Sequence, residues 1–369
     1  MRPNRRVIVL IAAGVALIAL SIIVYYLTRP HYVLKARQVS EEPKLDGKAD
    51  DAVWQKAEAV SIPVRNSEPV QLKCVYAGDR IFVMARFKDT VKDDIDEPWT
   101  YEGNGKWSRG RTSDQFALFF DIDSSVVDFD RKGFKVMNFG FKPYQKLWEF
   151  GIKGQAPKKG YWDGYKQRAD VWMMHSSISS PFGKGDDGIF KINPEYVFSP
   201  TTTKPVVWMQ WDQFDKPGML ILNTNIWTEA KKAGEGQTAA KITKEKPVYK
   251  YRQGLDIKNT PYPYIGQMEP ISDYSSFKNG DMIPWVMFEE SMKGSWGGSR
   301  ADIDGKMRWE NGYWTVEMGR RLNTEHPDDI LLRPEEKASI DFGVLIRSDG
   351  KTINYSEPAT FEFPSAGGK

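Results

Sequence analysis

The sequence predicts an all-β protein: an antiparallel β-sandwich with long loops and an insertion, preceded by one N-terminal transmembrane helix. Three observations indicate this class. Short runs of alternating apolar and polar residues recur along the chain, as in strands with one buried face. The composition, with 31 glycines, 22 prolines and 13 tryptophans, is typical of a turn-rich β protein. An uncharged stretch near the N-terminus stands apart from this pattern and predicts the helix.

The uncharged stretch covers residues 7–27 and indicates a membrane anchor. At about 1.5 Å per residue, a helix of this length spans roughly 30 Å, the thickness of the bilayer core. Arg2, Arg5 and Arg6 precede it, so residues 1–6 are expected to be a cytoplasmic tail and the main domain to be periplasmic. A cleaved signal peptide is the alternative. Its apolar core is usually shorter, and the Tyr-Tyr-Leu-Thr-Arg-Pro that ends this stretch is a poor cleavage site.

The rest of the chain is predicted to hold one domain. Residues 28–40 are expected to be a linker, residues 41–364 the β-sandwich and residues 365–369 a tail. Between about residues 181 and 299 the strand pattern weakens, which predicts an insertion within the domain rather than a second core. The charged stretch 231–254 is expected to cross the surface as a loop.

The strand pattern is clearest in two places. Residues 71–89 predict a hairpin whose turn is Ala77-Gly78-Asp79, and residues 113–123 are apolar on both faces, which predicts a central strand. A tight turn is expected at Leu45-Asp46-Gly47, followed by a single helical turn from Asp50 or Asp51 that carries Trp54 and Ala57. The other expected strands cover residues 61–64, 133–141, 148–153, 170–176, 206–211, 218–222, 306–309, 313–319, 338–346 and 352–363.

Several classes of chemistry are excluded by what the sequence lacks. Cys74 is the single cysteine, so the chain can form no internal disulfide and cannot ligate an iron–sulfur cluster. No C-x-x-C-H, H-E-x-x-H, Walker loop or G-x-S-x-G motif is present. The net charge of +3 comes without a basic helix, so no nucleic-acid partner is expected.

The segment KLDGKADDAVWQKAE, residues 44–58, resembles the opening of two sandwich families. One is the family-9 carbohydrate-binding modules, and the other is the haem-binding domain typified by the gamma subunit of ethylbenzene dehydrogenase. Three later stretches resemble the second family: an aromatic-x-Asp-Thr turn within residues 79–93, an Asp-hydrophobic-Trp segment within residues 168–190, and the run GSRADIDGKMRWENGYWTVEMGRRLNTEHPDD at residues 298–329.

This resemblance implies a non-catalytic redox subunit. In the family, a gamma subunit sits on a molybdenum enzyme of the dimethyl-sulfoxide-reductase type, and electrons pass between the molybdopterin subunit, an iron–sulfur subunit and a b-type haem in the gamma sandwich. The expected partners are therefore those two subunits, with a cytochrome c as a further donor or acceptor. An N-terminal anchor suits the membrane-bound nitrite oxidoreductase and nitrate reductase relatives.

The resemblance also suggests which residues hold one non-covalent haem b, in a flat apolar gap between two β layers. The family's methionine and lysine ligands correspond to Met137 and Lys351, and His175 is the alternative donor to iron. Arg320 and Arg321 are candidates for contacts with the haem propionates, because guanidinium groups suit carboxylates. A surface or Asp-paired role for these two arginines stays open.

The alternative function is a surface-anchored module of the carbohydrate-binding family-9 type, without haem. Trp99, Trp107, Trp162 and Trp296 lie in or near glycine-containing loops, where exposed indoles stack on sugar rings. The same tryptophans could equally close a core or line a partner interface.

Overall fold

The computed structural model describes residues 31–122, 167–192, 207–211, 220–223, 246–290, 298–326, 329–336, 339–348, 352–356 and 359–363. The chain divides into two compact units, residues 1–32 and residues 33–369, and the second is described below. Within the described ranges no helix combines the length and the apolar character needed to cross a membrane. The expected cytoplasmic tail (1–6) and anchor (7–27) both lie outside these ranges.

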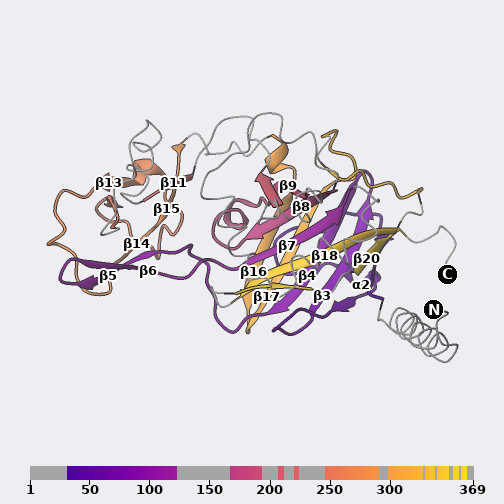
Figure 1. Ribbon diagram of the computed structural model, residues 1–369, viewed down its shortest axis with the longest axis horizontal. Coiled ribbons are helices and arrows are strands. Elements are labelled where there is room, and N and C mark those ends of the chain that lie inside the picture. The colour runs from indigo at the N-terminus through magenta and orange to yellow at the C-terminus, as the bar shows by residue number, and fades with distance from the viewer. Residues whose placement is uncertain are drawn as a thin grey trace, which may run out of the picture. The chain divides into compact units, whose positions relative to one another are not determined.

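Thirteen strands of the described chain pair into one sheet (Figure 1). They are β1 (Val33–Gln38), β2 (Val60–Ile62), β3 (Val70–Ala77), β4 (Arg80–Lys88), β7 (Gln115–Asp121), β8 (Gln167–His175), β9 (Asp186–Ile192), β10 (Val207–Trp211), β16 (Asp304–Glu310), β17 (Tyr313–Arg321), β18 (Ser339–Ser348), β19 (Thr352–Tyr355) and β20 (Ala359–Glu362). The order is β10-β9-β8-β7-β18-β20-β1-β3-β4-β17-β16, with β19 beside β18 and β2 beside β3.

Strand β1 joins the two halves of this sheet. Its first residues, Val33–Lys35, pair with β20, and its last residues, Ala36–Gln38, pair with β3. Both pairings are parallel, whereas the other pairs of the sheet are antiparallel in the described chain. The segment 28–40, which the sequence suggested as a linker, therefore holds a strand. Its alternation is only partly apolar, which hides it from a pattern search.

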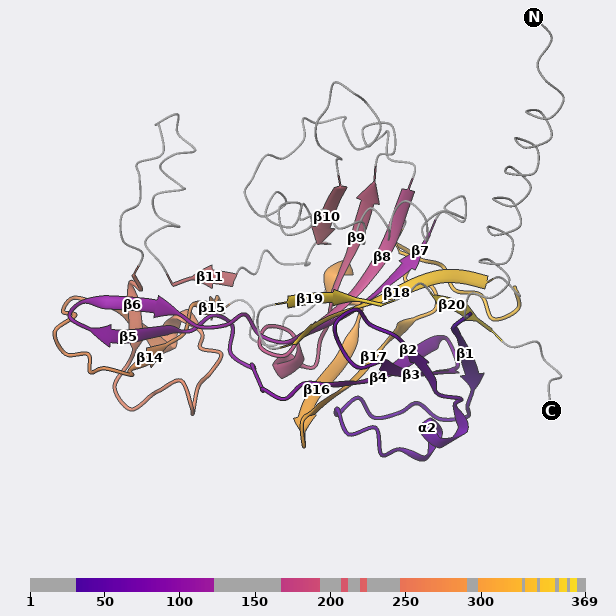
Figure 2. The same cartoon turned by 60° about the horizontal axis from the view of Figure 1, so that its bottom comes forward.

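The sheet curls so that its halves face each other as two layers (Figure 2). One layer contains β7, β8, β9 and β18, and the other contains β3, β4, β16 and β17. Across the gap Phe87 of β4 stacks on Phe116 of β7 with ring centroids 6.1 Å apart. The Trp314 indole of β17 donates a hydrogen bond to Asp114, just before β7. The prediction of an all-β sandwich is therefore confirmed for the described domain.

Most of the individual strand predictions agree with the structure. The hairpin expected at residues 71–89 is β3 and β4 with its turn at Gly78-Asp79, and the central strand expected at 113–123 is β7. The expected helical turn is α2 (Ala52–Lys56), which has Asp51 at its N-cap. The segment expected as one strand at 352–363 forms β19 and β20. The strands expected at 133–141 and 148–153 lie outside the described residues.

Glu317 organises the outside of the second layer. Its side chain lies on the opposite face of β17 from Trp314, because the two positions are three residues apart on a strand, and is fully buried. One carboxylate oxygen accepts a hydrogen bond from the Trp54 indole at 2.7 Å, and the other accepts from the backbone N–H of Gly47 at 2.7 Å. The tight turn and α2 are thus fixed onto the sheet by one carboxylate, and burial raises the pKa of Glu317.

Replacing Glu317 with Gln is expected to destabilise the fold by about 1–2 kcal/mol, because an amide offers one acceptor oxygen where the carboxylate offers two. Denaturant unfolding measures the change. Glu310→Gln, on the exposed end of β16, is the matched control and is expected to change the free energy of unfolding by less than about 0.5 kcal/mol. Equal effects of the two changes would contradict the role given to Glu317.

Residues 181–299, which were expected to be an insertion, contribute strands to the main sheet and also to separate small sheets. Strands β9 and β10 belong to the main sheet. Other parts form small sheets: β14 (Met282–Ile283) with β5 (Trp99–Gly103) and β6 (Lys106–Arg109), β11 (Leu220–Leu222) with β15 (Val286–Phe288), and β12 (Tyr249–Tyr251) with β13 (Met268–Pro270). The 3-10 helices are η3 (Ser180–Phe182), η4 (Ile265–Gln267) and η6 (Ser299–Ala301).

These small sheets share an apolar cluster of their own, although no second core was expected. Its buried members are Trp99, Tyr251, Ile257, Met268, Ile283 and Met287. The sequence pattern missed the cluster because its strands are only two to five residues long and are drawn from both sides of the main-sheet strands β7 to β10.

Candidate functional site

The interior between the two layers is filled by aromatic side chains. The Phe120 ring lies 5.0 Å from Trp172, 5.8 Å from Phe342 and 6.0 Å from Phe361, measured between centroids. All four residues are fully buried. In the described part of the interior these rings pack on one another instead of bordering a plate-shaped gap. The expectation of a haem between the layers stays a prediction, because Met137 and Lys351 lie outside the described residues.

Arg320 lies within this interior and is fully buried. It forms ion pairs with Asp170 at 2.8 Å, Asp187 at 3.1 Å and Asp329 at 3.3 Å, and donates a hydrogen bond to the carbonyl oxygen of Ile330 at 2.9 Å. Its guanidinium is therefore committed to carboxylates of the protein, the open alternative noted from the sequence, and is not available to a haem propionate. Arg321, the next residue, is exposed.

The Arg320 cluster joins the two layers electrostatically. Burial opposes charging of Arg320, but the three carboxylates outweigh it and raise the pKa of the guanidinium. Burial raises the pKa of Asp170 to about 6, and the charge of Arg320 limits that rise. The carboxylates of Asp170, Asp187 and Asp329 lie close enough together to hold a metal ion, but Arg320 already supplies their counter-charge. This arrangement is structural.

His326 and Asp302 lie beside this cluster and nearer to the surface. The Nδ1 atom of His326 is 2.8 Å from a carboxylate oxygen of Asp302 and 3.8 Å from Asp329. A His-Asp-Asp group of this kind has the ligand types of a divalent cation site. The His326 side chain is half-buried.

His175 ends β8 and is buried. Its Nε2 atom lies 3.8 Å from Asp186, and the other oxygen of that carboxylate accepts a hydrogen bond from Arg300 at 2.8 Å. Burial lowers the pKa of His175, which favours the neutral imidazole that a metal requires. On an alternating strand His175 lies on the face opposite to Asp170 and Trp172, so it points away from the sandwich interior.

We use the term outer face for the side of β7, β8 and β18 on which His175 lies. Because the register pairs Gln115 with both His175 and Arg347, the same side carries the alternate residues of all three strands. Its central side chains are apolar and at most 1% exposed: Ala117, Phe119, Val171, Met173 and Leu345. The sheet is therefore buried on both sides, which matches the prediction for β7 from its two apolar faces.

A polar row closes one end of the outer face. Across the strands it contains His175 of β8, Gln115 of β7 and Arg347 of β18. Gln115 is 4% exposed, and its side-chain oxygen has no hydrogen-bond partner among the described residues. Arg347 is partly buried. The outer face thus combines an apolar surface with a sulfur atom from Met173, a neutral imidazole and a cation at its border.

Two of the expected ligands cannot be compared with this geometry. Met137 and Lys351 lie outside the described residues, as do Trp162 and Trp296. For Lys351, the flanking residues Ser348 and Thr352 are paired across the hairpin of β18 and β19.

The two described tryptophans proposed as sugar platforms are not exposed. Trp99 is 1% exposed, and its indole donates a hydrogen bond to the carbonyl oxygen of Asn223 at 2.6 Å. Trp107 is half-buried, with its ring 5.0 Å from Tyr101 and 4.9 Å from Phe277. Both indoles pack in the second apolar cluster. Packing in a core was the alternative role that the sequence left open for these tryptophans.

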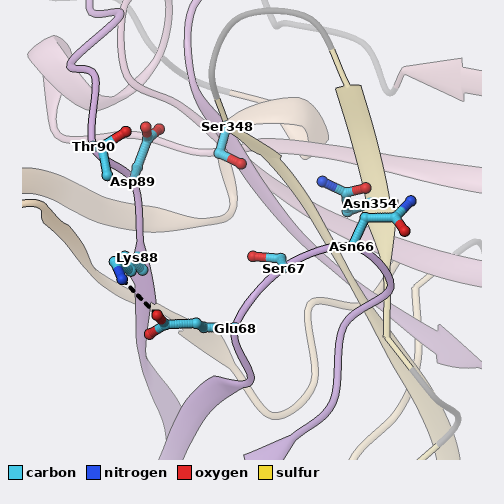
Figure 3. Close-up of a pocket in the computed structure, with 8 residues that line it drawn as sticks. All are labelled: Asn66, Ser67, Glu68, Lys88, Asp89, Thr90, Ser348 and Asn354. Carbon is cyan, nitrogen blue, oxygen red and sulfur yellow. Dashed lines mark hydrogen bonds and ion pairs between the residues drawn. The ribbon is translucent and has the colours of Figure 1, made fainter.

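A polar cleft of about 310 Å³ opens at one end of the sandwich (Figure 3). It is lined by Asn66, Ser67, Glu68, Lys88, Asp89, Thr90, Ser348 and Asn354. The Lys88 ammonium and the Glu68 carboxylate form an ion pair at its border, at 2.5 Å. The amides, hydroxyls and charges of this lining do not fit a flat apolar macrocycle, so the cleft is not a candidate haem site.

Comparison with known proteins gives one family. The family model described as ethylbenzene dehydrogenase matches residues 51–357. No curated protein sequence gives a significant match. Among solved structures, a carbohydrate-binding module of family 9 from Caldicellulosiruptor kristjanssonii in complex with glucose is 10% identical, with 91% of this chain and 98% of that chain covered and a TM-score of 0.30. A putative carbohydrate-binding protein from Bacteroides uniformis is 8% identical, with 91% and 100% covered and a TM-score of 0.32.

Proposed function

Because the chain belongs to the ethylbenzene dehydrogenase family, we propose that it is the electron-transfer subunit of a molybdenum oxidoreductase complex, binds one b-type haem and is not itself catalytic. Its partners in this proposal are the iron–sulfur and molybdopterin subunits, with a cytochrome c as a further donor or acceptor. Residues 7–27 would anchor it in the membrane, with residues 1–6 in the cytoplasm and the sandwich in the periplasm.

The observation that supports the proposal best is the match of the ethylbenzene dehydrogenase family model to residues 51–357. A non-covalent haem needs an apolar surface, one or two donors to iron and a polar border. Among the described residues, His175 at the end of β8 is a buried nitrogen donor, and burial lowers the pKa of its imidazole. Met137 and Lys351 remain the proposed axial ligands from the family resemblance, with His175 as the alternative.

A bound haem would supply a one-electron redox centre. The contribution of the chain is to keep that centre dry and fixed. Surroundings of low polarity would favour the less charged ferrous state of a bound haem and so raise its reduction potential.

An absorption spectrum tests the proposal. The full chain, expressed in cells supplied with haem and purified in mild detergent, is expected to show a Soret band, a reducible alpha band and one extractable haem b per chain. Met137→Ala and Lys351→Ala are each expected to shift the spectrum or lose the haem, whereas Met282→Ala, at an exposed position, serves as the matched control. Folded protein that retains no haem and binds to polysaccharide columns would instead support the carbohydrate-binding alternative.

A further inference from the structure

The polar cleft of about 310 Å³ at one end of the sandwich is not used by the proposed function (Figure 3). One wall is formed by Ser348 of β18 and Asn354 of β19. Both lie on the same side of these strands as the fully buried Ile346, which pairs with Asn354 and precedes Ser348 by two residues. Residues 88–90, at the end of β4, form the opposite wall, and the loop of residues 66–68 closes a third side. Polar side chains thus replace apolar ones on the inward side of the sheet where the cleft opens.

The charged side chains of the lining already have partners within the fold. Lys88 and Glu68 form an ion pair at 2.5 Å, which raises the pKa of Lys88. Asp89 is 2% exposed, and one of its oxygens accepts a hydrogen bond from the Val91 N–H at 3.0 Å. Burial and the charge of Asp89 raise the pKa of Asp114 to about 9, so that Asp114 is protonated at neutral pH and can donate to Asp89. An ionic ligand would compete with these pairings, whereas a neutral ligand leaves them intact.

The rest of the lining consists of uncharged groups that both donate and accept hydrogen bonds. They are two amides and three hydroxyls: Asn66, Asn354, Ser67, Thr90 and Ser348. An amide offers an acceptor oxygen and two donor hydrogens, and a hydroxyl offers one donor together with acceptor lone pairs. None of the lining residues is aromatic, so the cleft has no ring on which a planar ligand would stack. The ligand that matches this lining is neutral and carries several hydroxyl groups, each of which can donate and accept at once.

We propose that the cleft binds a small neutral polyol, such as a sugar alcohol, a cyclitol or a single sugar ring. Its volume lies at the lower end of the range of roughly 300–1,000 Å³ for small-molecule sites, which suits a ligand of this size. Asn354 and Ser348 are 6% and 7% exposed, so their side chains are already held in place and lose little freedom on binding. Binding here requires neither haem nor a partner subunit. It also differs from the binding of a polysaccharide on exposed indoles, because the cleft contains no aromatic platform.

A titration followed by ligand-observed NMR tests this assignment on the full chain. The protein is purified in a polyoxyethylene detergent, because maltoside detergents carry sugar head groups, and the probes are D-sorbitol, D-mannitol, myo-inositol and D-xylose. At least one of them is expected to bind with a dissociation constant of about 10 mM or tighter. D-Gluconate and D-glucamine are the anionic and cationic analogues of sorbitol. Each is expected to bind at least about tenfold more weakly than the tightest neutral probe, because the charges of the lining are already paired.

Two variants locate the binding site. Asn354→Leu keeps a side chain of similar size without hydrogen-bonding groups, and is expected to weaken binding by about tenfold or more. Thr90→Trp places a ring at an exposed position of the lining and is expected to abolish binding. Gln253→Trp, which is exposed and outside the lining, is the matched control and is expected to leave binding unchanged.

Three results would overturn the assignment of a polyol to this cleft. They are the absence of saturable binding of every neutral probe up to about 10 mM, tighter binding of a charged analogue, and unchanged binding in the folded variants. Thr90→Trp decides the location of the site even where Asn354→Leu affects folding, because Thr90 is exposed. In each case the proposed haem function would stand, since no haem is assigned to this cleft.

Discussion

Arg320→Met is expected to destabilise the folded chain by about 3–5 kcal/mol, the largest effect of any single substitution considered for this protein. The change leaves the buried carboxylates of Asp170, Asp187 and Asp329 without their counter-charge, and removes the hydrogen bond to the Ile330 carbonyl. Methionine fills most of the arginine's volume, so the loss comes from charge and hydrogen bonding rather than from a cavity. Guanidinium chloride unfolding at neutral pH measures it.

Arg321→Met provides the control on the adjacent residue. Its side chain is exposed, and the expected change is within about 0.5 kcal/mol. A triple variant tests whether the unpaired carboxylates cause this loss of stability. Adding Asp170→Asn and Asp187→Asn to Arg320→Met removes two of the unpaired charges, so it is expected to recover part of the stability. A loss below about 1 kcal/mol for Arg320→Met would show that the three carboxylates do not depend on this arginine.

The position of Arg320 shows which features of the site could be predicted from the sequence and which could not. Residues 313–319 were predicted as one strand, and the alternation within it places Trp314 and Glu317 on opposite faces. The same alternation puts Arg320 on the inner face, yet an arginine at the end of a strand reads as a surface residue. Its partners come from β8, β9 and residue 329, more than 100 residues away in two cases. Only the pairing of the layers brings these charges together.

Arg347 was missed for a related reason. The strand predicted at residues 338–346 stopped one position short of it, because a Lys/Arg next to Ser-Asp-Gly is typical of a hairpin turn. β18 in fact continues to Ser348. Extending the alternation by one step from Leu345 would have placed a charge at the end of an apolar face. Its surroundings could not be read from the sequence, since they include Gln115 and Asp96 from other segments.

The sequence predicted that the domain is all-β, but it did not predict which strands pair with one another in the curled sheet. Long strands such as β3, β4 and β17 carry eight or nine alternating residues and were found from that pattern alone. β1 pairs in parallel with two strands distant from it in sequence, and such pairing leaves no local turn signal. The strands of the second apolar cluster are too short for periodicity to identify them.

Asp114→Asn is expected to stabilise the fold, by on the order of 2–4 kcal/mol at pH 8. Asp114 is fully buried, and one of its oxygens accepts hydrogen bonds from the Asp93 N–H at 2.8 Å and from the Trp314 indole at 3.0 Å. Burial, and then the charge of nearby Asp89, raise the pKa of Asp114 to about 9. The folded protein therefore holds a proton on this carboxyl that the unfolded chain releases near pH 4.

The sign of the pH dependence follows from that proton. Between about pH 4 and pH 9 the folded state binds one proton more than the unfolded state at Asp114, so the free energy of unfolding falls as the pH rises through this window. Asparagine resembles the protonated carboxyl: its amide oxygen can accept the same two hydrogen bonds, and its amino group can donate toward Asp89. The stabilisation by Asp114→Asn is therefore expected to be near zero at pH 4 and to increase steadily toward pH 9.

Denaturant unfolding of the two proteins at several pH values measures this difference curve. Asp170, whose pKa is raised to about 6, also titrates, but it is present in both proteins and its contribution cancels in the difference. Asp114→Ala is the control, because it removes the charge together with the acceptor and is expected to leave the Trp314 indole without a partner. A difference curve that stays flat from pH 4 to pH 9 would mean that Asp114 is already ionised in the folded protein. In that case its charge would be balanced within the fold, and Arg347, on which Asp114 acts electrostatically, would be the group to examine next.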